Sequence, residues 1–129
     1  MKKIAIPVKM NRENPPLAPL FGKANWFAMV ENGKVEIVKN PAHGGGAVVA
    51  WLLEEGVDTL IFQEMGVTPF RKLEERNLMQ LYHAGFERIL LNEVLEKFEN
   101  GTLQPIDDTQ KKKIIAHHER KHSHGTHHH

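Results

Sequence analysis

The segment His43-Gly44-Gly45-Gly46 is the part of the chain whose residue types and spacing point most directly to chemistry. An apolar run, residues 47–53, follows it, and this pattern predicts a buried helix that begins at the glycines. Glycine backbone lets a ligand approach closely. The first N–H groups of a helix lack intrahelical partners and, with the positive end of the helix dipole, favour an anion. The segment therefore predicts an anion-binding edge, and a tight turn that needs positive φ is the alternative.

Three other side chains are candidates for the same edge. His43 precedes the predicted helix, where a neutral imidazole would ligate a metal or hydrogen-bond a cluster sulfide, and a turn-capping role is the alternative. The motif Phe21-Gly22-Lys23-Ala24 would supply a counter-charge through its lysine if this turn folds over the pocket. A solvated surface lysine is the alternative. In Gln63-Glu64-Met65-Gly66 the thioether is a soft ligand for copper or cluster iron, although most methionines fill gaps in cores.

Histidines form a second group near the C-terminus, where seven of the nine lie in the last thirteen residues. His117, His118, His122 and His124 stand among ordinary residues, whereas residues 127–129 have the form of an expression-tag remnant. This density of imidazoles is typical of Ni, Zn or Cu binding. We interpret the segment as a disordered tail that scavenges or stores metal ions, with an incidental tail as the alternative.

The composition is that of a globular domain and argues against a membrane protein or a disulfide-bonded one. The chain has 129 residues, enough for one domain with a core, and 40% hydrophobic and 26% charged residues are typical of a soluble globular protein. It contains no cysteine, which excludes disulfides and thiolate ligands. No apolar run approaches the ~20 residues of a membrane helix, and the first residues lack the pattern of a signal peptide. These features predict a cytoplasmic location.

The net charge of +1 hides an uneven distribution. Residues 111–129 hold five Lys or Arg and one Glu, which leaves 12 basic and 15 acidic side chains in the first 110 residues. A mildly acidic body argues against a nucleic-acid-binding domain, which usually presents a basic face. The basic tail alone predicts only weak, salt-sensitive binding to polyanions.

Hydrophobic patterns and turn signals predict an alternation of strands and helices. The expected strands are residues 4–8, 26–30, 34–38, 57–62 and 78–82, and the expected helices are residues 46–55, a helix capped by Thr68 with Pro69 at its first position, and residues 89–99. This order implies an α/β fold with a mixed sheet of about five strands and helices on its faces. In such sheets, ligands bind at the edge where strands end and helices begin, here the loops 39–46 and 63–68.

Five motifs occur in an order that resembles one known family. They are Ile4-Ala5-Ile6-Pro7, Phe21-Gly22-Lys23-Ala24, Asn40-Pro41-Ala42-His43-Gly44-Gly45-Gly46-Ala47, Gly56-Val57-Asp58 and Gly101-Thr102-Leu103. This resembles the dinitrogenase iron-molybdenum cofactor biosynthesis family, the small nitrogenase accessory factors. The resemblance covers residues 1–103, which we take as the domain, and leaves residues 104–129 as a linker and a basic, His-rich, disordered tail. A frayed helix over residues 109–121, with few apolar side chains to bury, is the alternative for part of this tail.

The resemblance implies a ribonuclease-H-like fold that binds or carries an iron–sulfur or iron–molybdenum–sulfur cluster. It implies cluster donor and acceptor proteins as partners. The chain departs from the family pattern at Leu20, where the family often has a polar residue such as His, and it lacks the thiolates that usually ligate iron–sulfur centres. Binding of an intact anionic cluster through N–H groups and a few side chains is compatible with both departures.

Three classes of function follow from these observations. The first is a carrier that holds an anionic metal–sulfur cluster at the glycine edge and hands it to a metalloprotein. The second, hydrolysis of nucleic acid, needs carboxylates for paired metal ions, but strand 4–8 has none and Asp58 stands at the start of its strand. The chain also offers no Ser-His-Asp or Cys-His arrangement, so we predict no enzyme. The third is a regulatory interaction module without cargo.

Overall fold

A mixed β-sheet forms the framework of the structure, a computed structural model that describes residues 2–76 and 79–123. Its strands are β1 (Lys3–Val8), β2 (Trp26–Glu31), β3 (Lys34–Lys39), β4 (Thr59–Phe62), β5 (Gln80–His83) and β6 (Gln104–Pro105). The order across the sheet is β3-β2-β1-β4-β5-β6, in which β1, β4 and β5 are parallel and the outer pairings are antiparallel. The predicted α/β fold with a mixed sheet is confirmed. The sheet has six strands and not about five, because the sequence analysis missed the two-residue β6.

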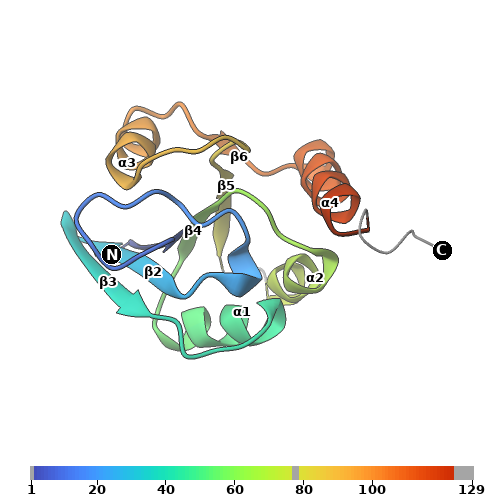
Figure 1. The fold of residues 1–129 in the computed structure, drawn as a ribbon, viewed down its shortest axis with the longest axis horizontal. Coiled ribbons are helices and arrows are strands. Elements are labelled where there is room, and N and C mark those ends of the chain that lie inside the picture. Colours follow the sequence, from blue (N-terminus) through green and yellow to red (C-terminus); the bar gives the residue numbers. More distant parts are fainter. Residues whose placement is uncertain (1, 77–78, 124–129) are drawn as a thin grey trace.

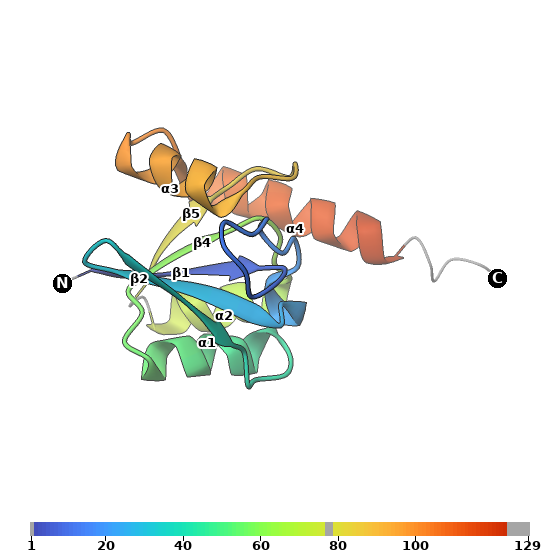
Figure 2. The same cartoon turned by 60° about the vertical axis from the view of Figure 1, so that its left-hand side comes forward.

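Helices connect these strands and cover both faces of the sheet (Figures 1 and 2). They are the short 3-10 helix η1 (Phe21–Lys23) and the α-helices α1 (Gly45–Glu54), α2 (Val67–Arg76), α3 (Leu91–Glu99) and α4 (Asp108–Ser123). Helix α2 begins before the predicted cap Thr68, so Pro69 lies within the first turn, where its missing N–H costs no intrahelical bond. Strand β5 and helix α3 each begin two residues later than predicted.

The core has two layers, one on each face of the sheet. On one face, Phe21, Phe27, Phe62 and Phe70 form a series of edge-on ring contacts beneath α1 and α2. On the other face, the aliphatic side chains of β1 and β4 pack against α3. Because β1 and β4 are buried on both faces, they read as continuous apolar runs in the sequence.

Residues with positive φ mark the turns that direct the chain. Asn32 (φ 54°) and Gly33 (φ 77°) form the predicted hairpin between β2 and β3. Gly56 (φ 81°) and Gly101 (φ 73°) follow α1 and α3, where a left-handed residue ends a helix. The parallel crossovers then bring the beginnings of α1 and α2 to the edge of the sheet where β1 and β4 end, as the sequence analysis predicted.

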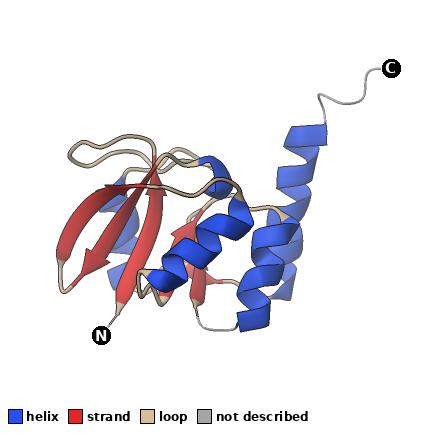
Figure 3. Cartoon of the chain, turned by 90° about the horizontal axis from the view of Figure 1, so that it is seen from below, coloured by secondary structure: helices blue, strands red, loops and turns tan. Residues whose placement is uncertain are grey.

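Helix α4 stands in place of the predicted disordered tail (Figure 3). The Asp107 side chain accepts a hydrogen bond from the Gln110 N–H (2.8 Å) at the start of the helix, and Ile114 is fully buried against the α1/α2 face of the core. Lys111 forms an ion pair with Glu74 of α2. The N-terminal part of α4 therefore packs on the domain although most of its side chains are polar. No helix in the described ranges is long and apolar enough to cross a bilayer.

Candidate functional site

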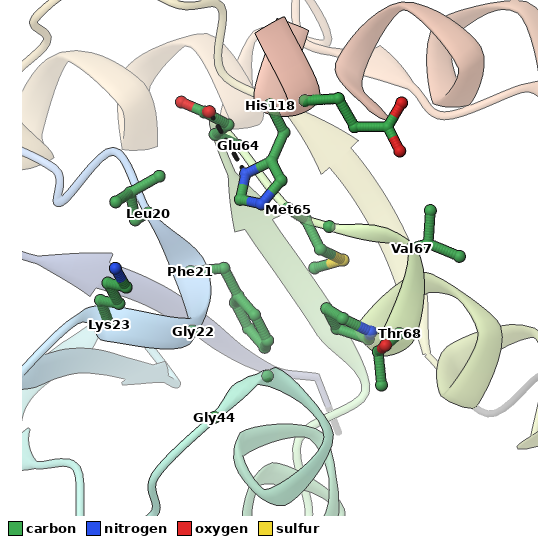
Figure 4. Close-up of a pocket in the computed structure, with 14 residues that line it drawn as sticks. Leu20, Phe21, Gly22, Lys23, Gly44, Glu64, Met65, Val67, Thr68 and His118 are labelled. Carbon is green, nitrogen blue, oxygen red and sulfur yellow. Dashed lines mark ion pairs between the residues drawn. The ribbon is translucent and has the colours of Figure 1, made fainter. Parts of the chain in front are cut away.

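A pocket of about 390 Å³ opens where α1 and α2 begin (Figure 4). Four segments line it: residues 20–23 around η1, residues 44–45 at the start of α1, residues 64–69 between β4 and α2, and residues 118–119 of α4. The first three segments belong to the edge predicted from the sequence. The fourth comes from the segment that was predicted to be disordered.

Most of the predicted binding residues meet in this pocket. Those that line it are Phe21, Gly22, Lys23, Gly44, Gly45, Met65 and Gly66. His43 is exposed and does not line it; it lines a neighbouring hollow of about 280 Å³ that shares Gly22, Lys23 and Gly44 with the pocket. Gly46 lies against Lys72 of α2 instead. Ligand binding by these residues stays a prediction.

Two helix N-termini face the pocket. The first intrahelical bond of α1 runs from Val48 N–H to the Gly44 carbonyl (3.0 Å), so the N–H groups of residues 45–47 precede the helical ladder. Gly44 adopts φ 90° and, as a glycine, caps the helix with no side chain. In α2, Val67 and Thr68 of the first turn line the same pocket. Aligned peptide dipoles therefore place partial positive charge at two sides of one cavity.

Close backbone packing explains two of the glycines. A Cβ on Gly22 would lie 3.1 Å from the Gly45 nitrogen, and a Cβ on Gly45 would lie 2.7 Å from Pro69 Cγ. Thus η1, α1 and α2 meet at distances that leave no room for a side chain at the floor of the pocket. These glycines shape the cavity through packing as well as through access to the backbone.

Glu64 is a buried carboxylate in the pocket wall, with 2% of its surface exposed. Its Oε1 lies 3.3 Å from His118 Nδ1, and its Oε2 lies 3.8 Å from His117 Nδ1, both on α4. A carboxylate is buried only where polar partners replace water, and the two imidazoles supply that here. The sequence analysis missed this pairing. The position of Glu64, two residues after the buried strand β4, was the one local signal for it.

A series of ring contacts joins α4 to β5 and the loop that follows it. The His83 ring contacts the Phe86 ring edge-on (4.7 Å between centroids), and Phe86 stacks on His117 (3.9 Å). His83 Nε2 lies 3.0 Å from the Gln63 carbonyl oxygen. Burial lowers the pKa of His83 below its usual 6.5, the contact with the Gln63 carbonyl raises it, and the nearby charge of His117 lowers it further.

Two of the predicted metal ligands of the tail, His117 and His118, lie in the part of the chain whose side chains the structure describes. In residues 2–76 and 79–123, no group of three or more His, Cys, Asp or Glu side chains is arranged to hold a metal ion. His117 and His118 face Glu64. His124 and the side chain of His122 lie outside the described part of the chain. Nothing in the structure supports Ni, Zn or Cu binding there.

Fold and site together define a small α/β domain with a pocket at the beginnings of two helices. Residues 2–101 match the family described as dinitrogenase iron-molybdenum cofactor, and the chain belongs to this family. The resemblance noted from the motifs is thereby confirmed. Helix α4 begins at residue 108, beyond the matched segment.

Solved structures agree with this assignment. The NMR structure of a NifB-like protein from Thermotoga is 30% identical, with a TM-score of 0.68, over 81% of this chain and 93% of that one. The apo form of the orange protein from Desulfovibrio gigas is 21% identical, with a TM-score of 0.70, over 83% of this chain and 98% of that one, and at this identity it shows the fold alone. None of the curated proteins compared with the chain matches it.

Proposed function

We propose that this protein binds an anionic metal–sulfur cluster, of the iron–sulfur or iron–molybdenum–sulfur type, and carries it to an acceptor metalloprotein in the cytoplasm. The observation that carries the proposal is the convergence of the α1 and α2 N-termini on one pocket. Membership of the cofactor family supports a cluster or cofactor as the ligand. The protein acts as a carrier and not as an enzyme, since holding an intact cluster needs no acid, base or nucleophile.

The size and charge of the pocket suit such a ligand. Its volume of about 390 Å³ lies in the range of small-molecule sites, roughly 300–1,000 Å³. Lys23 adds an exposed positive charge at the rim. Of the two carboxylates in the wall, Glu64 faces the imidazoles of α4, and Glu119 is exposed to water, which screens its charge. Backbone amides, more than net side-chain charge, therefore provide the attraction for an anion.

A charge substitution at Thr68 tests this proposal without disturbing the fold. Thr68 is exposed, lies in the first turn of α2 and lines the pocket. Glutamate at a helix N-terminus stabilises a helix by about 0.3–1 kcal/mol, so Thr68→Glu should fold normally while it places a negative charge beside the ligand. The probe is tetrathiomolybdate, the simplest molybdenum–sulfur anion, titrated anaerobically and followed by its visible absorption.

We expect Thr68→Glu to weaken tetrathiomolybdate binding by about tenfold or more, which corresponds to about 1.4 kcal/mol. The matched variant Thr68→Gln has the same size and no charge, and it should bind like the natural protein. Equal binding by the Glu variant would reject this pocket. Absence of binding by the natural protein would reject the carrier function and leave the interaction module as the function to pursue.

A further inference from the structure

Helix α4 lies outside the segment that matches the family, yet it supplies part of the pocket wall. We propose that His118 of α4 is the side-chain ligand of the cargo, binding an iron atom of the cluster through Nε2, while Glu64 orients the imidazole ring. This inference rests on the proposed carrier function and names the residue that holds the metal. It differs from the sequence-based prediction, which placed His118 in a disordered tail.

The position of Glu64 fixes which ring nitrogen faces the ligand. Its carboxylate oxygen Oε1 lies 3.3 Å from His118 Nδ1, in a wall where Glu64 itself is 2% exposed. A carboxylate beside Nδ1 favours the tautomer that carries its proton there, which leaves the lone pair on Nε2. Figure 4 shows the His118 ring reaching from α4 to Glu64 at one end of the pocket.

Gly66 lies beside this nitrogen and has no side chain to cover it. A Cβ on Gly66 would lie 3.2 Å from His118 Nε2 and 3.4 Å from Cδ2, so any side chain there would press against the Nε2 edge of the ring. Gly66 also lines the pocket. The ligating nitrogen and the cavity are therefore adjacent, and the absence of a side chain at residue 66 is what joins them.

The donor chemistry fits a chain without cysteine. Imidazole is a good ligand for iron, and a carboxylate on its second nitrogen raises its basicity. The Met65 side chain, 1% exposed, adds a soft thioether to the same wall. The bond forms from the Nε2 lone pair as a solvent ligand leaves the iron, so it needs no oxidant or reductant. A single imidazole bond supplemented by amides also suits a cargo that is later released.

His117 provides a matched control on the same helix. It faces the same carboxylate, with Nδ1 3.8 Å from Glu64 Oε2, but its ring stacks on Phe86 and does not line the pocket. The two adjacent histidines thus share a partner and differ in access to the cavity. If the two histidines only hold α4 in place, replacing either one should weaken ligand binding. If His118 ligates the metal, only its replacement should do so.

The test uses the full chain and two anaerobic probes. Tetrathiomolybdate presents only sulfide to the protein, whereas the dichloride adduct of ferrous iron with tetrathiomolybdate is also an anion and presents iron with exchangeable chloride ligands. We expect His118→Gln to weaken binding of the iron-containing anion by about tenfold or more and to leave tetrathiomolybdate binding within about threefold. Iron X-ray absorption should show the outer-shell scattering of an imidazole ring in the natural protein and in His117→Gln, and none in His118→Gln.

Each result separates the two proposals. Unchanged affinity for the iron-containing anion in His118→Gln, or imidazole scattering that persists there, overturns the role of His118. Binding of tetrathiomolybdate would still support the carrier. Failure of the natural protein to bind either probe overturns both. Glu64→Gln is a second variant, which keeps the side-chain size but weakens the orienting contact, and we expect it to lower affinity for the iron-containing anion alone.

Discussion

At the scale of single residues, burial decides which titratable groups make the stability of the fold depend on pH. His83 is 9% exposed, and its ring lies between the Gln63 carbonyl and the Phe86 ring. Because burial lowers the pKa of His83, the folded protein favours the neutral ring and the unfolded chain binds the proton more readily. The resulting contribution to stability is complete above the unfolded pKa of about 6.5 and is lost as the pH falls below that value.

We therefore predict that His83→Gln flattens the dependence of stability on pH. Glutamine keeps an amide that can donate to the Gln63 carbonyl but does not titrate. Urea unfolding of both proteins at about pH 7.5 and about pH 5.5 measures the effect. The natural protein should lose more unfolding free energy between the two pH values than the variant. An equal loss in both would show that the pKa of His83 is not lowered in the fold.

The contacts of Glu64 show where sequence-based prediction of the site reaches its limit. The residues of the glycine edge were found because each belongs to a local motif beside a helix start. Two partners of the Glu64 carboxylate, His117 and His118, lie more than fifty residues further along the chain. No periodicity or turn signal links such positions, and only the packing of α4 brings them together. His43 was favoured for its neighbours in sequence, yet it lines the adjacent hollow.

At the scale of elements, the contact between α1 and α2 makes two neighbouring glycines behave differently. A Cβ on Gly45 would meet the rigid ring of Pro69 at 2.7 Å, whereas a Cβ on Gly46 would meet the flexible end of the Lys72 side chain at 2.9 Å. The proline ring cannot move without shifting its helix. The lysine side chain can swing away into solvent.

We predict opposite outcomes for alanine at these two positions. Gly45→Ala should lower the unfolding free energy by about 1–3 kcal/mol, the usual cost of overpacking. Gly46→Ala should be neutral or should stabilise by up to about 1 kcal/mol, because alanine has the higher helix propensity. Urea denaturation gives both values, and each variant serves as the control for the other. Similar destabilisation by both would mean that the two helices cannot adjust at either contact.

The elements that the sequence could predict are those with a local backbone signal. The Asn32-Gly33 hairpin and the glycines that end α1 and α3 rest on backbone conformations that few other residues adopt, so their signals are local and strong. Helix α4 has few apolar residues, and over residues 108–120, whose burial is described, Ile114 is the one fully buried side chain. Its stability comes from contacts with the domain, and these have no periodic pattern. The cap at Asp107 was the local signal available.

At the scale of the whole molecule, α4 and the family domain share one core. Ile114 belongs to the layer that also contains Phe62, Phe70 and residues of α1. Lys111 lies over the Phe70 ring, 5.9 Å from its centroid, and pairs with Glu74. The helix should therefore unfold together with the sheet and not before it.

We predict that unfolding in urea is a single transition and that Ile114→Ala lowers its free energy by about 2–4 kcal/mol. Tryptophan fluorescence follows the core, where Trp51 packs on Phe27 at 5.6 Å, and circular dichroism follows all the helices including α4. Coinciding midpoints are the expected result. The exposed neighbour Lys113 gives the control, since Lys113→Ala should change stability by less than about 0.5 kcal/mol. A separate early loss of helix in the natural protein would contradict a shared core.

The division of the pocket between the domain and α4 has an evolutionary consequence. The family fold supplies the shape of the cavity and its amides, whereas residues 118–119 belong to a helix beyond the family segment. Selection can thus exchange this helix, or the two side chains it contributes, while the ancestral scaffold stays intact. Relatives that share the scaffold but end in other helices would have the same cavity floor with a different wall.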